Sequence, residues 1–274
     1  MYAATPDNRP RGPVNVHTLH RMKREGEKIA ALTAYDYTFA ALEDAAGVDV
    51  MLVGDSLGMV VQGRDSTLPV TVEEIVYHCR CVAAGRHRAL IMADMPFMSH
   101  GTLEQGLANA GLLMKQGGAH MVKVEGAADQ ARLIAAMASA GVPVCAHLGL
   151  RPQSVHKLGG YRVQGKDEKS AKIMIDDAVV LEEAGADMLL LECVPAALAE
   201  RISTHARIPV IGIGAGSGCD GQILVVQDML GITQGKTPKF AHDFMPGQDS
   251  VASAVEAYVV AVKSGGFPAA EHCF

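Results

Sequence analysis

The sequence predicts an α/β protein folded as a single (β/α)8 barrel, the TIM barrel, and three observations lead to this fold. Eight short apolar runs rich in Val, Ile and Leu recur along the chain without strict alternation, which is typical of parallel strands covered on both faces. Segments with helical patterns lie between most of these runs. The length of 274 residues also suits such a barrel, which needs about 250. A doubly wound sheet is the alternative, but it usually has fewer strands and a glycine fingerprint after the first.

The expected elements follow one another in a regular order. Strands are predicted at residues 28–33, 48–53, 89–93, 121–124, 143–146, 188–191, 209–213 and 223–226, and helices at 72–84, 103–116, 128–140, 169–184 and 196–206. Several helical segments end in glycine just before the next strand, where glycine supplies the left-handed conformation of a helix C-cap. Only the Gly-rich link 214–222 lacks a helical pattern.

The chain divides into one catalytic unit with two short extensions. We expect residues 1–15 to form a flexible N-terminal arm, 16–266 the barrel and 267–274 a C-terminal tail. A final helical pattern at 249–263 fits either the last barrel helix or a contact with another subunit.

Composition excludes several classes of function. Lys and Arg number 24 against 30 Asp and Glu, a formal net charge of −6, so the chain lacks the basic face that nucleic acid or an anionic membrane requires. No apolar stretch is long enough to span a bilayer, and no signal peptide is visible at the N-terminus. Six scattered cysteines without C-x-x-C repeats argue against a zinc site. Together these features favour a cytoplasmic protein with reduced thiols.

Polar residues close the predicted strands, at the end of a barrel where catalysis takes place. Lys123 and Glu125 are two residues apart on one strand, so their side chains project to the same side. Several carboxylates at one mouth repel one another unless a cation holds them, and oxygen ligands without a Cys/His cluster favour Mg²⁺. The residues closing the strands are Asp36, Asp55, Asp94, Glu125, His147, Glu192 and Asp228.

Each of these side chains also has a structural interpretation. An Asp at a strand end is often a helix N-cap, and Asp36 and Asp228 are assigned to that class. A turn could equally account for Asp55 and for Asp94, a solvated rim position for Glu192 and a structural hydrogen bond for His147. The glycine-rich run 212–218 favours a plain turn over a phosphate cradle, because it contains no Lys or Arg.

A series of longer motifs is more specific than any single residue. They are KIAALTAYDYTFA (28–40), VGDSLGMVVQGRDSTLPVT (53–71), ADMPFMS (93–99), VKVEG (122–126), AHLGLRPQSVHKLGGYRVQG (146–165), LLLECVP (189–195) and IGIGAGSGCDGQILVVQDMLGI (211–232). In this order they closely resemble the ketopantoate hydroxymethyltransferase family over residues 17–266. The resemblance implies a barrel of the phosphoenolpyruvate/pyruvate type, a bound Mg²⁺ and 5,10-methylenetetrahydrofolate as donor.

The resemblance also implies roles for individual residues. Asp55 and Asp94 look like direct metal ligands, and Glu125 like a third acidic contact to the metal. Ser56 and Lys123 look like the groups that bind the carboxylate of the substrate, 3-methyl-2-oxobutanoate; as metal ligands, Asp55 and Asp94 would contact that substrate as well. Glu192 looks like the base that removes its C3 proton, giving an enolate that takes up the one-carbon unit to form ketopantoate, the first step of pantothenate synthesis.

Two departures and two rival hypotheses accompany this resemblance. Arg151 stands where the family usually has Thr, and residues 217–219 vary, which puts folate contacts and loop geometry in doubt. The rivals are another Mg²⁺-dependent 2-oxo acid lyase of the same superfamily and a non-catalytic barrel whose acids merely cap helices. The family further implies a homo-oligomer, a decamer.

Overall fold

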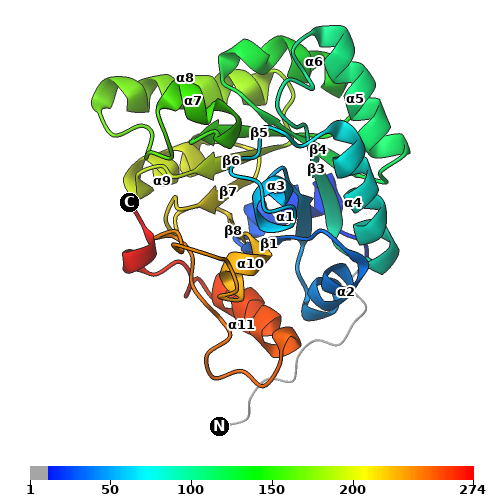
Figure 1. Ribbon diagram of the computed structural model, residues 1–274. Coiled ribbons are helices and arrows are strands. Elements are labelled where there is room, and N and C mark those ends of the chain that lie inside the picture. The colour runs from blue at the N-terminus through cyan, green and yellow to red at the C-terminus, as the bar shows by residue number, and fades with distance from the viewer. Residues whose placement is uncertain (1–11) are drawn as a thin grey trace.

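The computed structural model describes residues 12–274, and eight parallel strands form a closed barrel at its centre (Figure 1). Each strand pairs with the next in sequence, and the last pairs with the first. The strands are β1 (Ile29–Thr33), β2 (Val50–Val53), β3 (Leu90–Asp94), β4 (Met121–Glu125), β5 (Val144–Gly149), β6 (Met188–Glu192), β7 (Val210–Ile213) and β8 (Gly221–Leu224). The predicted (β/α)8 barrel is confirmed.

Helices surround the strands, as Figure 1 shows. The longer ones are α2 (Tyr37–Ala46), α4 (Val72–Gly85), α5 (Leu103–Lys115), α6 (Ala131–Ser139), α8 (Glu168–Glu183), α9 (Ala196–His205) and α11 (Val251–Lys263). Short helices follow three strands, namely α3 (Leu57–Val60), α7 (Val155–Leu158) and α10 (Val226–Met229). In the fully described stretch between β7 and β8 there is no helix, as the glycine-rich link indicated. Within residues 12–274, no helix is both long and apolar enough to cross a membrane.

Helix α11 is the last helix of the barrel wall. Its Tyr258 is fully buried, and the hydroxyl donates to the carbonyl oxygens of Ala31 at 2.8 Å and Gln222 at 3.1 Å. Those two residues lie on β1 and β8, so the tyrosine joins the first and last strands from outside. Strand β8 begins two residues earlier than expected, because Gly221 lets its backbone lie against that of Ile29.

Helix α1 (Val16–Glu25) closes the amino-terminal end of the barrel, which we call the floor. Leu19 and Met22 are buried beneath the strands, and Asn15 caps the helix by accepting from the amide of Thr18. The amide of Val14 donates to the carbonyl of Arg88 at 2.8 Å, which fastens the chain just before the helix. Of the predicted arm, residues 1–11 lie outside the described part of the chain.

The floor carries a bonding pattern that repeats four times. The residue just before each even-numbered strand donates its amide to a carbonyl near the start of the preceding strand, at 2.8 Å each time. Its side chain accepts the amide of that same partner, at 2.8–3.0 Å. The pairs are Asp49 with Ala30, His120 with Ile91, Asp187 with Val144 and Asp220 with Val210. These paired bonds set the register of neighbouring strands.

Cations neutralise two of these floor carboxylates. Asp49 is 2% exposed and lies 2.7 Å from Arg88 Nη2 and 2.5 Å from Lys263 Nζ. Asp220 accepts from Lys23 Nζ at 2.6 Å. Charge is therefore matched at these two positions, and the side chains serve the fold.

Candidate active site

A cavity of about 620 Å³ opens at the carboxyl ends of the strands. Its acidic wall comes from the ends of β2, β3, β4 and β6, and His147 on β5 completes the ring. The polar residues predicted for chemistry all line this cavity, namely Asp55, Ser56, Asp94, Lys123, Glu125 and Glu192. The structure therefore brings together residues that are up to 137 positions apart in the sequence (192 minus 55).

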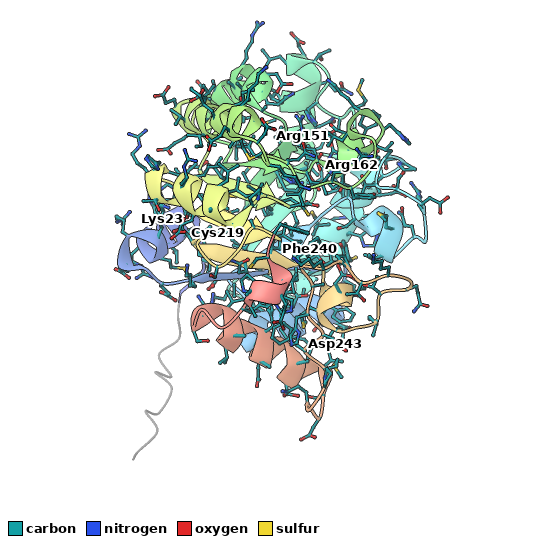
Figure 2. The ribbon with its side chains drawn as sticks, turned by 90° about the vertical axis from the view of Figure 1, so that its left-hand side faces the viewer. Lys23, Arg151, Arg162, Cys219, Phe240 and Asp243 are labelled. Atoms are coloured by element: carbon teal, nitrogen blue, oxygen red, sulfur yellow. The ribbon has the colours of Figure 1, made fainter. Side chains whose placement is uncertain are left out.

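The opposite side of the cavity is formed by the segment before α11 and by the C-terminal tail. Phe240 and Phe274 lie against Gly214, where an added Cβ would stand 3.0 and 3.1 Å from their side chains. The amide of Ala196 donates to the carbonyl of Phe274 at 3.0 Å, which holds the tail down. Figure 2 shows Phe240 beside the short C-terminal helical turn. Aromatic rings thus cover this part of the glycine-rich run that had been weighed as a phosphate cradle.

Asp55 and Asp94 are neighbours across the ends of β2 and β3. Asp94 is the last residue of β3 and is 1% exposed. Its Oδ2 accepts the backbone amide of Asp55 at 3.1 Å, and its Oδ1 lies 2.9 Å from Lys123 Nζ. Burial and the neighbouring Asp94 and Glu125 carboxylates hold the pKa of Asp55 well above its usual range.

Lys123 is the only cation that lines the acidic side of the cavity among the described residues. Its ammonium nitrogen lies 3.9 Å from Glu125 Oε1, which confirms that the two side chains share one side of β4. Burial alone would lower the pKa of Lys123, but the surrounding carboxylates raise it above its usual value. Lys123 therefore stays charged.

His147 lies between Lys123 and the predicted base. Its Nδ1 is 3.2 Å from Lys123 Nζ, and its Nε2 is 3.4 Å from Glu192 Oε2. Because an ammonium group can only donate, Nδ1 accepts and the ring carries its proton on Nε2, facing Glu192. Burial lowers the pKa of His147 well below its usual value, so the ring is neutral. Its place in the acidic ring is more central than the structural role that the sequence favoured.

The backbone around Glu192 is tightly constrained. Gly149 on β5 has φ +93°, and an added Cβ would stand 2.2 Å from the carbonyl oxygen of Glu192. Cys193, the next residue along, is buried and has the left-handed value φ +48°, which is uncommon outside glycine. Burial raises the pKa of the Glu192 carboxyl to about 8. Glu192 is thus held in one place and kept less acidic than an ordinary glutamate.

Gln153 is a member of the site that the sequence did not reveal. It follows β5 in a single 3-10 turn and is 7% exposed. Its side-chain nitrogen donates to Asp55 Oδ2 at 2.9 Å, and its backbone amide donates to Glu125 Oε2 at 3.1 Å. It stands in a motif quoted for the family resemblance, but no spacing rule connects it with carboxylates 98 and 28 residues away.

Ser56 has a hydrogen-bond partner that the sequence also left unassigned. Tyr35 is 3% exposed, and its hydroxyl lies 2.7 Å from Ser56 Oγ. Burial raises the pKa of Tyr35, so the phenol keeps its proton. The pair orients the serine hydroxyl at the wall of the cavity.

The fit of a metal ion can be tested on these oxygens. Among residues 12–274, no three Asp, Glu, His or Cys side chains already stand in the arrangement of a metal site. The donors nevertheless suit a hard cation, since Asp55, Asp94 and Glu125 offer only oxygen. Glu125 Oε1 is buried without a hydrogen-bond partner in the described chain, and burial raises the pKa of Glu125 to about 8. The site thus lacks positive charge, and a divalent cation would supply it by drawing the carboxylates together.

The two acids assigned as helix caps have different outcomes. Asp36 caps α2, accepting the amide of Phe39 at 3.0 Å, as predicted. Asp228 does not cap a helix: it lies inside α10 and accepts from the Thr233 hydroxyl at 2.5 Å. Helix α10 begins directly after β8, which leaves no room for a cap at that position.

Aromatic and basic groups line the outer part of the cavity. Tyr161, Phe240 and Phe274 contribute rings, and Lys236 and Lys239 lie on the same rim. Aromatic residues make up only 4% of the chain, so composition alone does not indicate a ring that could stack on a flat ligand. The fold concentrates three of the twelve Tyr and Phe residues here, six of each being present in the chain.

Residues 13–270 match the family model described as ketopantoate hydroxymethyltransferase. The chain is 65% identical over 274 residues to the 3-methyl-2-oxobutanoate hydroxymethyltransferase of Alkalilimnicola ehrlichii, covering all of this chain and 99% of that one. It is 59% identical to the enzyme of the same name from Halorhodospira halophila, covering 96% and 95%.

Solved structures show a similar fold at low sequence identity. A phosphoenolpyruvate phosphomutase from Streptomyces platensis superposes with a TM-score of 0.61 at 13% identity, covering 79% of this chain and 83% of that one. A 2,3-dimethylmalate lyase, a member of the PEP mutase/isocitrate lyase superfamily, gives a TM-score of 0.57 at 15% identity, with 78% and 79% covered. These likenesses show the same barrel fold, and the phosphoenolpyruvate/pyruvate type stays a prediction from the family resemblance.

Proposed function

Because the chain belongs to the ketopantoate hydroxymethyltransferase family, we propose that it transfers a hydroxymethyl unit from 5,10-methylenetetrahydrofolate to 3-methyl-2-oxobutanoate. The products are 2-dehydropantoate (ketopantoate) and tetrahydrofolate, in the first step of pantothenate synthesis. The overall change consumes one water: C3 of the oxo acid exchanges its hydrogen for a hydroxymethyl group, and the folate leaves as tetrahydrofolate.

The observation that carries this proposal is the composition of the cavity wall. One buried, charged lysine stands among four carboxylates, and Glu192 lies at the edge of that group. Removal of a C3 proton from a 2-oxo acid needs a group that binds its carboxylate, positive charge near its keto oxygen and a base beside C3. The cavity provides candidates for all three.

Lys123 and Ser56 are proposed to bind the substrate carboxylate. Lys123 offers a point charge with three donors, and Ser56 can add a hydrogen bond. Because Tyr35 lies 2.7 Å from the serine oxygen, the serine is directed before substrate arrives.

Asp55, Asp94 and Glu125 are the residues proposed to hold Mg²⁺, with Glu125 contacting it directly or through water. When bound, the ion would stabilise negative charge developing on the keto oxygen during proton removal. The fit rests on the oxygen-only donor set and on Glu125 Oε1, which is buried and has no hydrogen-bond partner among the described residues. The protein's own part is to hold these oxygens in a buried wall, where fixed charges act strongly.

Glu192 is proposed as the base that takes the C3 proton. Its pKa of about 8 makes the ionised form a stronger base than an ordinary glutamate. His147 Nε2 lies 3.4 Å from Glu192 Oε2 without forming a hydrogen bond, so a neutral imidazole borders the proposed base. The aromatic and basic groups on the outer rim are proposed to receive the folate.

Proton exchange tests this assignment without the folate. We expect 3-methyl-2-oxobutanoate in D₂O to lose its C3 proton signal by NMR when the protein and Mg²⁺ are both present. Glu192→Gln should abolish the exchange while leaving the protein folded. Addition of 5,10-methylenetetrahydrofolate to the wild type should then produce ketopantoate.

Each outcome points to one hypothesis. No exchange with the wild type, even with folate added, would refute the proposed mechanism. Exchange without product formation in the presence of folate would instead favour another 2-oxo acid lyase of the same superfamily. Homodecameric assembly and a cytoplasmic location stay predictions from the family, which sedimentation and fractionation can test.

A further inference from the structure

Gln153 donates hydrogen bonds to two carboxylates of the cavity wall, from its side-chain nitrogen to Asp55 and from its backbone amide to Glu125. We propose that Gln153 is a positioning residue: it sets the orientation of Asp55 and Glu125 before any cation arrives, and so sets the affinity of the site for a divalent cation. The inference rests on the proposed metal-binding role of those two carboxylates. It extends that role by naming what holds them.

The side-chain amide of Gln153 is fully used as a donor. Its nitrogen donates to Asp55 Oδ2 at 2.9 Å and to the Met95 carbonyl oxygen at 2.9 Å. An amide nitrogen has two hydrogens, so both are committed. Met95 follows Asp94 directly, and its own amide donates to the carbonyl of Lys123 at 3.0 Å. One amide therefore fixes a carboxylate after β2 against the backbone that leaves β3.

The backbone of Gln153 holds a second carboxylate. Its amide donates to Glu125 Oε2 at 3.1 Å, while Glu125 Oε1 has no hydrogen-bond partner within residues 12–274. One oxygen of the pair is thus anchored, and the other is left available. Pro152 precedes Gln153 at the start of the 3-10 turn, and a turn leaves its first amides without internal partners. Glu125 satisfies one of them.

The chemistry of an amide suits this task better than a charged donor would. A second lysine here would neutralise the carboxylates and compete with a divalent cation for them. A glutamine orients the same oxygens but adds no charge, so the site keeps its excess of negative charge. Figure 2 labels Arg151, two residues before Gln153. The hydrogen bonds within the described chain include none from the Arg151 side chain to these carboxylates, so this role falls to Gln153.

Binding of Mn²⁺, a spectroscopic substitute for Mg²⁺, tests the proposal without substrate or turnover. We would measure the dissociation constant by electron paramagnetic resonance for the wild type and for Gln153→Met. The methionine removes both side-chain donors but keeps the length of the side chain and the backbone amide. Loss of a group that orients metal ligands typically weakens metal binding about 10- to 100-fold, and we expect a change of that size.

Gln222→Met is the matched control. Gln222 is also buried, at 3% exposed, and its side-chain nitrogen donates to the carbonyl of Gly216 at 3.0 Å rather than to a carboxylate of the cavity wall. Its substitution should leave Mn²⁺ affinity unchanged even if stability falls. If Gln153→Met folds poorly, Gln153→Asn keeps an amide at the position but is one methylene shorter, and it should weaken Mn²⁺ binding in the same direction.

The outcomes are distinct. Weaker Mn²⁺ binding in the Gln153 variants but not in Gln222→Met supports the positioning role. Wild-type affinity in a folded Gln153→Met protein would overturn it, while the proposed metal site would still stand if Asp55→Asn abolished binding. A wild type that does not bind Mn²⁺ would overturn the proposed metal site and this inference together, while the proposed proton transfer to Glu192 would remain open to the exchange experiment.

Discussion

The two ends of the barrel treat buried carboxylates in opposite ways. At the floor, Asp49 has two cations and a backbone amide around it, and Asp220 has a cation and a backbone amide. At the mouth, four carboxylates of the described chain share the single ammonium of Lys123. Carboxylates thus stabilise the fold at the floor, whereas at the mouth they leave an excess of negative charge that a cation could neutralise.

This difference separates stability from chemistry along the barrel axis. A carboxylate that is already paired with a cation has no need of a bound metal ion, so removing it lowers the free energy of unfolding. An uncompensated one has a raised pKa, as Glu125 and Glu192 do at about 8, and perturbed values of this kind are a mark of functional sites. Substitutions at the two ends should therefore change different measurements.

The largest effect is expected at the mouth. Glu192→Gln should lower kcat about 10²- to 10⁴-fold, because it removes the proposed base, with little change in KM.

The same substitution should also change how stability depends on pH. A carboxyl whose pKa rises from 4.5 to about 8 on folding makes the metal-free protein lose stability as the pH rises through that range. The variant should lack this loss, so its melting temperature relative to the wild type should increase towards pH 8. If Glu192→Gln melted below the wild type by the same amount at every pH, the carboxylate at the mouth would not differ from those at the floor.

At the floor, Asp49→Asn should act on folding instead. Removing the carboxylate takes away the close anionic partner of Arg88 and leaves Lys263 paired with Glu27 at 3.2 Å, and breaking a buried pair costs about 3–5 kcal/mol. Both cations reach solvent in part, so we expect the lower end of this range in urea unfolding. Asp176→Asn is the control, since its pair with Lys172 is exposed and should be worth less than about 1 kcal/mol. Activity per folded molecule should stay at the wild-type level in both.

Glu43 is an exception outside the mouth and sharpens the comparison. It is fully buried on α2, and neither carboxylate oxygen has a hydrogen-bond partner within residues 12–274. Burial raises the pKa of Glu43 well above the usual value. The carboxyl therefore destabilises the folded protein more and more as the pH rises above its pKa in the unfolded chain. Glu43→Met should stabilise the protein at neutral pH by about 1–3 kcal/mol. The gain should shrink towards pH 4, and a loss of stability at pH 7 would show that the carboxylate has a structural role.

The smallest effect is expected for Asp36, the acid that belongs to a helix cap. Asp36→Ala should cost about 1 kcal/mol, the usual value of an N-cap, and should leave Mn²⁺ affinity and turnover unchanged. Asp36→Ser, which keeps a capping oxygen, should restore the stability. A large loss of turnover in a stable Asp36→Ala protein would move this residue into the active site.

Much of the fold was predictable because its signals are local. Most strands contain a short apolar run, and glycine often marks the return from helix to sheet. Helix α1 escaped prediction because it buries only Leu19 and Met22 among charged residues. The start of β8 escaped because Gly221 and Gln222 are not apolar, and their place is set by pairing with β1.

The residues of the site likewise fall into those with a local sequence signal and those without one. Strand ends gather at one face of any such barrel, so Asp55, Asp94, Lys123, Glu125 and Glu192 could be grouped from the sequence. Gln153 and Tyr35 could not, since each acts through a contact made only when distant segments meet. Asp228 was wrongly predicted to be a helix N-cap, because no local sequence pattern indicates how soon α10 begins after β8.

The fourfold bonding at the floor has a consequence for the ancestry and redesign of such a barrel. Each Asp or His before an even strand locks one pair of strands on its own, so the sheet can be regarded as four modules of similar construction. A module secured from below can exchange the loop above it without losing its alignment. The loops above one pair of strands can therefore be replaced to change the reaction, while the other three pairs keep the barrel closed.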